Sequence, residues 1–170
     1  MKRTFAKATL AAFSFVAVMA MAPAPVGPPW ISIEYPPSPF DATTRDAFLL
    51  VHAFHHGTPM NFPVAGRAEG VVAGKRKSIT LDFTRTSRDG VYALRKQWPD
   101  KGVWTLVIGV TQGEGEMNTV KAVVEIGTNG QVASVVVPTK MAGIHRVPAP
   151  VNMADVESDL KTRAARVASR

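Results

Sequence analysis

Short stretches of alternating apolar and polar residues, each closed by a turn signal, run through most of this 170-residue chain. Between positions 78 and 85, for example, Ile79, Leu81 and Phe83 alternate with small or charged residues. This period of two is typical of a β-strand that buries one face. Asn129-Gly130, between two such stretches, is a strong signal of a two-residue hairpin turn. The pattern predicts roughly seven or eight short strands between positions 29 and 138.

Strands at this spacing favour one all-β domain, an immunoglobulin-like antiparallel β-sandwich, which we place at residues 30–140. Apolar residues make up 46% of the chain, enough for a single domain with its own core. The nearly unbroken apolar run from Ala47 to Phe54 predicts a strand that is buried on both faces. Prolines flank the apolar stretch that begins at Trp30, which predicts an edge strand there.

The N-terminal residues have the pattern of a secretory signal peptide. Cations in the first seven residues precede an uncharged, apolar stretch at 8–22. We expect cleavage after Ala20, or else after Ala22, so that 1–20 is the signal peptide and 21–29 a proline-rich leader. The predicted localisation is therefore periplasmic or secreted. The apolar stretch is shorter than a membrane-spanning helix requires, and an uncleaved N-terminal anchor is the open alternative.

The C-terminal segment 141–170 has a different pattern. Positions 141–150 predict a loop. From Val151 onward acidic residues precede basic ones, an order that the helix dipole favours. Apolar residues recur there at helical spacing, at Met153, Val156, Leu160, Ala164 and Val167. This predicts a short amphipathic helix capped by Asn152 or Asp155, and it leaves open whether the helix packs on the sandwich or forms a loosely attached tail.

Two stretches resemble a known family. The segments Asp89-Gly90-Val91-Tyr92 and Trp98 to Leu106 share a Gly-x-Tyr…Pro-x-x-Gly-x-Trp-x-Leu pattern with exported immunoglobulin-like modules of the YtkA-like kind. The segment from Leu50 to Leu81 resembles them in its strand, Gly-x-Pro turn and following strands. The resemblance implies structural roles for Tyr92, as a tyrosine corner, and for Trp104. It also implies a binding or scaffolding function, sometimes linked to metal handling, although this chain has no cysteine pair.

Histidine and methionine gather just after the apolar run at 47–54. His55, His56 and Met60 offer imidazole and thioether donors, which suit copper. They are the candidate metal ligands of an alternative function, a periplasmic copper-handling accessory protein. The plainer interpretation is that they are polar residues at a strand end and in a loop.

Positive charge is concentrated between Lys75 and Lys101, a segment that contains eight cations and only three acids. This segment supplies a candidate surface for an anionic partner such as a lipid or an acidic protein, formed by Lys75, Arg76, Lys77, Arg95 and Lys96. A solvated basic surface is the alternative. We expect no nucleic-acid partner, because the chain has no aromatic-basic binding motif.

The sequence carries no catalytic signature. There is no Gly-x-Ser-x-Gly motif, and the absence of cysteine excludes disulfides and thiolate chemistry. We therefore expect no enzyme and no cofactor apart from the copper alternative, and a small hydrolase with an unrecognised site is a further alternative. The predicted function is a non-catalytic interaction or scaffolding module that binds a protein or a cell-envelope component. Contact with a membrane surface through the basic patch or the C-terminal helix is part of that prediction.

Overall fold

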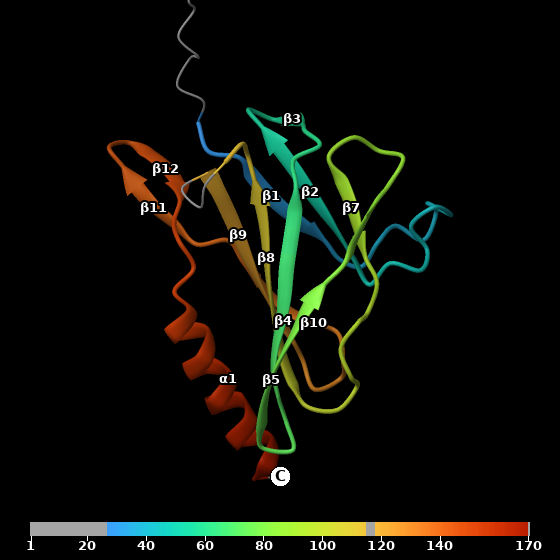
Figure 1. Cartoon of the computed structure of the whole chain (residues 1–170), viewed down its shortest axis with the longest axis vertical. Coiled ribbons are helices and arrows are strands. Elements are labelled where there is room, and N and C mark those ends of the chain that lie inside the picture. The colour runs from blue at the N-terminus through green and yellow to red at the C-terminus, as the bar shows by residue number, and fades with distance from the viewer. Residues whose placement is uncertain (1–26, 115–117, 170) are drawn as a thin grey trace, which may run out of the picture.

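The computed structural model describes residues 27–114 and 118–169 (Figure 1). The predicted signal peptide and most of the predicted leader lie outside the described residues. Within them, two antiparallel sheets pack against each other, and a helix lies on the outer face of one sheet. The prediction of an all-β domain is confirmed.

Sheet A contains the N-terminal strands. Its strand order is β1-β2-β7-β6, and a two-residue strand, β3, pairs with the end of β2. The strands are β1 (Trp30–Glu34), β2 (Leu49–His55), β3 (Thr58–Pro59), β6 (Phe83–Arg85) and β7 (Val91–Leu94). Leu49, Leu50 and Val51 are fully buried, so β2 is shielded on both faces as predicted.

Sheet B contains the longer strands, in the order β10-β9-β8-β4-β5. They are β4 (Val64–Val72), β5 (Lys75–Leu81), β8 (Val103–Thr111), β9 (Thr119–Ile126) and β10 (Val132–Val136). The two sheets together have the A-B-E-D and C′-C-F-G strand orders of an immunoglobulin-like sandwich. The predicted fold is therefore confirmed, and β10 is an additional strand beyond the position of strand G.

The structure has more strands than the sequence predicts, partly because one predicted strand changes sheet. The alternating stretch at 78–85 breaks at Asp82 into β5 of sheet B and β6 of sheet A. The side-chain amide of Gln97 holds this corner: its Oε1 accepts from the backbone N–H of Asp82 at 2.9 Å, and its Nε2 donates to the carbonyl of Asp82 at 2.8 Å. The alternation of apolar and polar residues continues through this corner, so the sequence does not indicate where the chain changes sheet.

The C-terminal segment is more ordered than predicted. The predicted loop is wrong over most of 141–150, where β11 (Thr139–Ala142) and β12 (His145–Pro148) form a separate hairpin. The helix α1 (Met153–Ala168) follows, and Oδ1 of Asn152 caps it by accepting from the N–H of Ala154 at 3.0 Å. The helix docks on sheet B, because its buried side chains form a second apolar cluster with that sheet, made by Val103, Val107, Val156 and Leu160.

The main core contains a close contact between Trp104 and Gly70. Trp104 lies on β8 and is almost fully buried, and its Nε1 donates to the carbonyl of Lys101 at 3.1 Å. Gly70 lies opposite it on β4, and its missing side chain makes room for the indole. An ideally placed Cβ on Gly70 would lie only 2.6 Å from Cδ2 of Trp104. Only glycine fits this position without displacing the indole.

The substitution Gly70→Ala tests that contact. Because the new methyl group must push Trp104 out of its position, we expect the free energy of unfolding to fall by about 2–3 kcal/mol. Chemical denaturation measures this loss. Gly109→Ala on β8 is the matched control, since its Cβ would have looser neighbours: Cγ2 of Thr119 at 3.2 Å, Cγ of Lys121 at 3.5 Å and the carbonyl oxygen of Ala65 at 3.8 Å. Equal losses in the two variants would contradict the assigned role of Gly70.

Candidate interaction surface

The described part of the sandwich ends in four edge strands: β1 and β6 of sheet A, and β5 and β10 of sheet B. An edge strand presents unpaired backbone N–H and C=O groups to which another chain can add a strand. Soluble proteins block such edges with proline, charged side chains or very short strands. The four edges can therefore be compared by how well each one is blocked.

Three of these edges carry such protection. Prolines stand on both sides of β1, at 28–29 and 36–37. The strand β5 begins with three consecutive cations, Lys75, Arg76 and Lys77. The strand β6 is only three residues long and ends at Arg85. Each of these features disfavours the addition of a further strand.

The fourth edge, β10, is the least protected of the four, with a register shift near its start and Pro138 two residues after its end. It has the sequence Val-Ala-Ser-Val-Val, without a charge or a proline, and among the described residues it pairs with β9 alone. Val135 and Val136 are 41% and 52% exposed. The register shifts between Val132 and Ser134, and from Ser134 to Val136 the pairing with β9 is regular. This end of β10 is an open, apolar template for another strand.

A shallow groove of about 220 Å³ lies beside the start of β10. Ala133 of β10 and Glu125 of β9 line it from sheet B, and Arg163, Arg166 and Val167 line it from the last turns of α1. Val167 is 44% exposed. Arg166 has no ion-pair partner within residues 27–114 and 118–169. The surface next to β10 therefore combines apolar side chains with an available positive charge.

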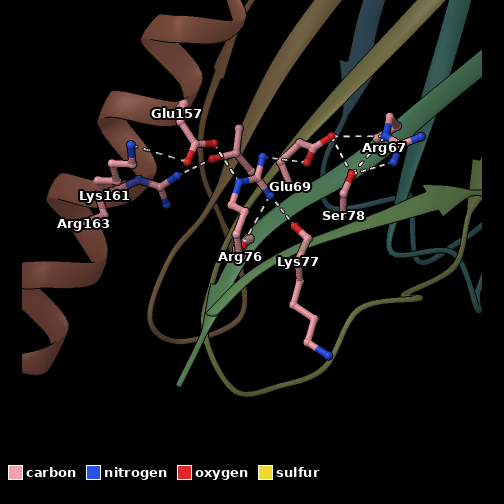
Figure 2. A network of polar contacts seen from close by, with 10 residues as sticks. Arg67, Glu69, Arg76, Lys77, Ser78, Glu157, Lys161 and Arg163 are labelled. Carbon is pink, nitrogen blue, oxygen red and sulfur yellow. Dashed lines mark hydrogen bonds and ion pairs between the residues drawn. The ribbon is translucent and has the colours of Figure 1, made fainter. Parts of the chain in front are cut away.

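The position of α1 depends on a buried carboxylate, Glu69, which Figure 2 shows between sheet B and the helix. Glu69 lies on β4 and is only 5% exposed. Its Oε1 accepts from Ser78 at 2.8 Å and from Arg67 at 3.2 Å, and its Oε2 accepts from Arg76 at 2.7 Å. Arg76 also donates to Glu157 of α1, at 2.7 Å. Arg76 thus bridges the carboxylate in the sheet and the carboxylate on the helix.

These contacts determine the charge state of Glu69. Burial alone would raise the pKa of its carboxyl, but the hydrogen bonds from Ser78 and Arg76 and the charge of Arg76 outweigh burial and hold the pKa below its ordinary value of 4.5. Glu69 is therefore ionised at neutral pH, and its charge is compensated by Arg67 and Arg76.

A second arginine fixes the other end of the helix. Arg163 pairs with Asp159 at 2.6 Å and donates to the carbonyls of Trp104 and Ile126, each at 3.4 Å, and to Oγ1 of Thr105. Thr105 stands opposite Glu69 in the pairing of β8 with β4. The two arginines therefore hold α1 on the same stretch of sheet B, and they position its last turns beside β10.

The candidate cations lie in two separate segments of the chain. Lys75, Arg76 and Lys77 belong to β5, whereas Arg95 and Lys96 follow β7. Arg76 bridges Glu69 and Glu157, Arg95 lies 3.7 Å from Asp46, and Lys96 pairs with Asp100. Three of the five charges thus have acidic partners. Binding of an anionic partner at this patch stays a prediction.

The candidate metal ligands lie around a tight turn between β2 and β3. His56 and Gly57 form this turn with φ values of 49° and 79°. The rings of His55 and His56 are 4.1 Å apart between centroids, and Nε2 of His55 lies 3.1 Å from the carbonyl oxygen of Gly27. Met60 follows β3 and is partly exposed. Within the described ranges, no three His, Asp or Glu side chains are grouped to hold a metal ion. The metal site stays a prediction.

Tyr92 makes a hydrogen bond that differs from the tyrosine corner that the resemblance implies. Its hydroxyl donates to the carbonyl of Phe62 at 2.7 Å and so ties β7 to the segment before β4. A tyrosine corner lies near the start of strand F, whereas β7 has the position of strand E. The hydroxyl of Tyr92 does tie a loop to the sandwich, but not at the position of a tyrosine corner.

The open edge at β10 was not predicted. The Asn129-Gly130 hairpin predicts that the strand at 132–137 pairs with the strand before it, but not whether a second strand covers its other side. The signal was present in the composition: the run Val132 to Val137 has no charged residue, unlike the start of β5. Its meaning depends on the strand order, which only the structure gives.

Comparisons with protein-family models, with curated proteins and with solved structures each give no match. In the part of the chain that the structure describes, no helix is long and apolar enough to cross a membrane.

The network around Glu69 predicts a pH-dependent stability. Glu69→Gln removes the charge that Arg67 and Arg76 compensate, and we expect the free energy of unfolding at neutral pH to fall by about 2 kcal/mol. Because folding lowers the pKa of Glu69, its contribution is complete above the ordinary pKa and is lost as the pH falls through the lowered value. The difference between wild type and variant should therefore be constant above about pH 5 and shrink below about pH 4.

Denaturant unfolding across this pH range measures the difference. Glu125→Gln, on the outer face of β9, is the control, because Glu125 has no ion pair among the described residues. It should change stability little. If Glu69→Gln lowered the free energy of unfolding by the same amount at low pH as at neutral pH, the assigned charge state would be wrong.

Proposed function

We propose that this protein is a non-catalytic, exported interaction module that binds an extended segment of a partner protein as an added strand beside β10. The observation that supports this most is the uncharged, exposed edge of β10 in a sandwich whose other described edges are protected. Export is proposed from the N-terminal sequence pattern. The resemblance to YtkA-like modules favours the same class of function.

Strand addition explains how a surface without a deep cavity can bind specifically. The backbone groups on the free side of β10 would supply hydrogen bonds that do not depend on the partner's sequence. Val135 and Val136 point to opposite faces of the sheet, since successive side chains in a strand alternate. A partner strand with β-branched side chains would pack against both, and the pattern of its side chains would provide specificity.

The charge around β10 indicates which kind of partner fits. No acidic residue occurs between Glu125 and Asp155. Arg166 lies at the groove beside Ala133. An acidic side chain on the partner would find Arg166 there, in a groove that Arg163 and the carboxylate of Glu125 also line. We therefore propose an extended, apolar segment that carries an acidic residue.

The test is a selection of binding peptides followed by mapping. Short random peptides displayed on phage are selected against the full chain, and Val136→Lys places a charge on the open edge of β10. We expect selected peptides to be rich in β-branched residues, to protect the amides of β10 from hydrogen exchange and to lose at least about tenfold in affinity for Val136→Lys. Thr84→Lys, at an exposed position of the edge strand β6 in the other sheet, is the control and should keep the affinity.

Two results would overturn this proposal. Peptides that bind Val136→Lys as well as wild type would show that β10 is not the acceptor. A concentration-dependent dimer that Val136→Lys abolishes would show that the edge pairs with a second copy of the chain instead of a partner protein.

The contact between the rings of His55 and His56 favours copper handling as the second candidate. If both rings bind one ion, copper should raise the melting temperature of the protein by several degrees when present at about a hundred times its dissociation constant. His55→Ala should abolish that rise. His145→Ala, in the hairpin β11–β12, is the matched control and should preserve it. A melting temperature that copper leaves unchanged would refute the copper candidate.

A further inference from the structure

The hairpin formed by β11 and β12 stands apart from the rest of the fold. It pairs with neither sheet among the described residues, and Figure 1 shows it projecting from one end of the sandwich. A two-stranded hairpin has little stability of its own in water. If the hairpin were only a solvated loop, its side chains would be polar. Apolar side chains there would indicate a function.

The tip of the hairpin exposes its largest apolar side chains. Ile144 is 88% exposed and Met141 is 61% exposed. Gly143 lies between them at the turn, with φ of 62°. Burying two such side chains in the sandwich would stabilise the fold, and the hairpin instead holds both away from the core. Their exposure is explained if the tip enters an apolar phase.

The apolar tip is surrounded by positive charge. Lys140, His145 and Arg146 are all exposed on the hairpin. None has an ion-pair partner within residues 27–114 and 118–169, and no acidic residue occurs between Glu125 and Asp155. Two apolar side chains flanked by cations fit the boundary of an anionic bilayer, where acyl chains lie beneath negatively charged headgroups.

The start of the described chain lies at the same end of the molecule. Pro28 lines a hollow of about 440 Å³ together with Lys140 and Pro148 of the hairpin. Figure 1 shows the start of the described chain, in blue, and the hairpin at the same end of the sandwich. The sequence upstream contains the uncharged, apolar stretch at 8–22. If this stretch stays uncleaved, the alternative left open above, it would tether the domain to a bilayer at the end that carries the hairpin.

From these observations we propose that the tip of the β11–β12 hairpin docks into an anionic phospholipid bilayer. Ile144 and Met141 enter the boundary between headgroups and acyl chains, while Lys140 and Arg146 contact the headgroup phosphates. The contact is weak and reversible, because two apolar side chains and a few cations form a single membrane signal of modest strength. This proposal does not depend on strand addition at β10, which involves a different surface.

The bilayer is favoured over a protein partner by the size of the surface. Stable protein interfaces bury roughly 800 Å² on each partner around a central apolar anchor. The tip offers only Met141 and Ile144 as large exposed apolar side chains, with cations on both sides. A bilayer needs no complementary shape, and its negative surface attracts these cations from a distance.

The chain has no cysteine, so a single introduced thiol can be labelled without background. In the full chain, Ile144→Cys is labelled with a nitrobenzoxadiazole fluorophore and mixed with vesicles of phosphatidylglycerol and phosphatidylcholine. We expect a blue-shifted, stronger emission that disappears with pure phosphatidylcholine and weakens at high salt. Thr128→Cys, in the turn between β9 and β10, carries the same label as the control and should show no shift.

A second measurement leaves the apolar tip free of label. The double substitution Met141→Ser with Ile144→Ser should reduce binding to the anionic vesicles about tenfold or more in sedimentation. Lys140→Glu with Arg146→Glu should abolish the salt-sensitive part of the binding. All four positions are exposed, so the melting temperature should not change.

Three results would overturn the proposal. The label at Ile144 could stay unshifted with anionic vesicles. The labels at Ile144 and Thr128 could shift equally, which would mean that the apolar stretch at 8–22 adsorbs the whole chain without orienting it. The serine variant could bind as tightly as wild type.

Discussion

The packing of Trp104 into the space above Gly70 is the contact on which the sandwich depends. The chain has no cysteine, so no disulfide joins the sheets and the apolar core alone must hold them together. Trp104 contributes the largest fully buried side chain of that core, and it sits on β8, between β4 and β9. The indole therefore packs over β4, the strand that carries Glu69, and on the other side of β8 lies β9, the strand that pairs with β10.

The outer face of sheet B imposes a second constraint. Val103 and Val107 point away from the main core and need a cover, and α1 provides it with Val156 and Leu160. Apolar contact alone would let the helix rotate, but the bridge of Arg76 between Glu69 and Glu157 has a fixed geometry. Helix position is thus set by charge as well as by burial. The same position brings Arg166 to the groove beside β10.

The sequence predicted what depends on local periodicity and missed what depends on spatial neighbours. The alternation at 119–126 and the Asn129-Gly130 turn were sufficient to predict strands, because burial of one face leaves a period of two. The break at Asp82 was not predictable, since the partner of its backbone groups, Gln97, lies fifteen residues away. The hairpin at 139–148 was missed because its apolar residues face solvent, which removes the alternation that marks a half-buried strand.

The two proposed surfaces are connected by the chain itself. Only Val137 and Pro138 separate β10 from β11, so a strand added beside β10 would end close to the hairpin. Docking of the hairpin on a bilayer would then fix the direction of β10 relative to the membrane, because Pro138 and Ala149 hold the base of the hairpin together by a backbone hydrogen bond of 2.8 Å. A partner segment bound at this edge would approach along the side of the sandwich. Orientation by the hairpin would thus increase the chance that a membrane-attached partner meets the free edge in a productive direction.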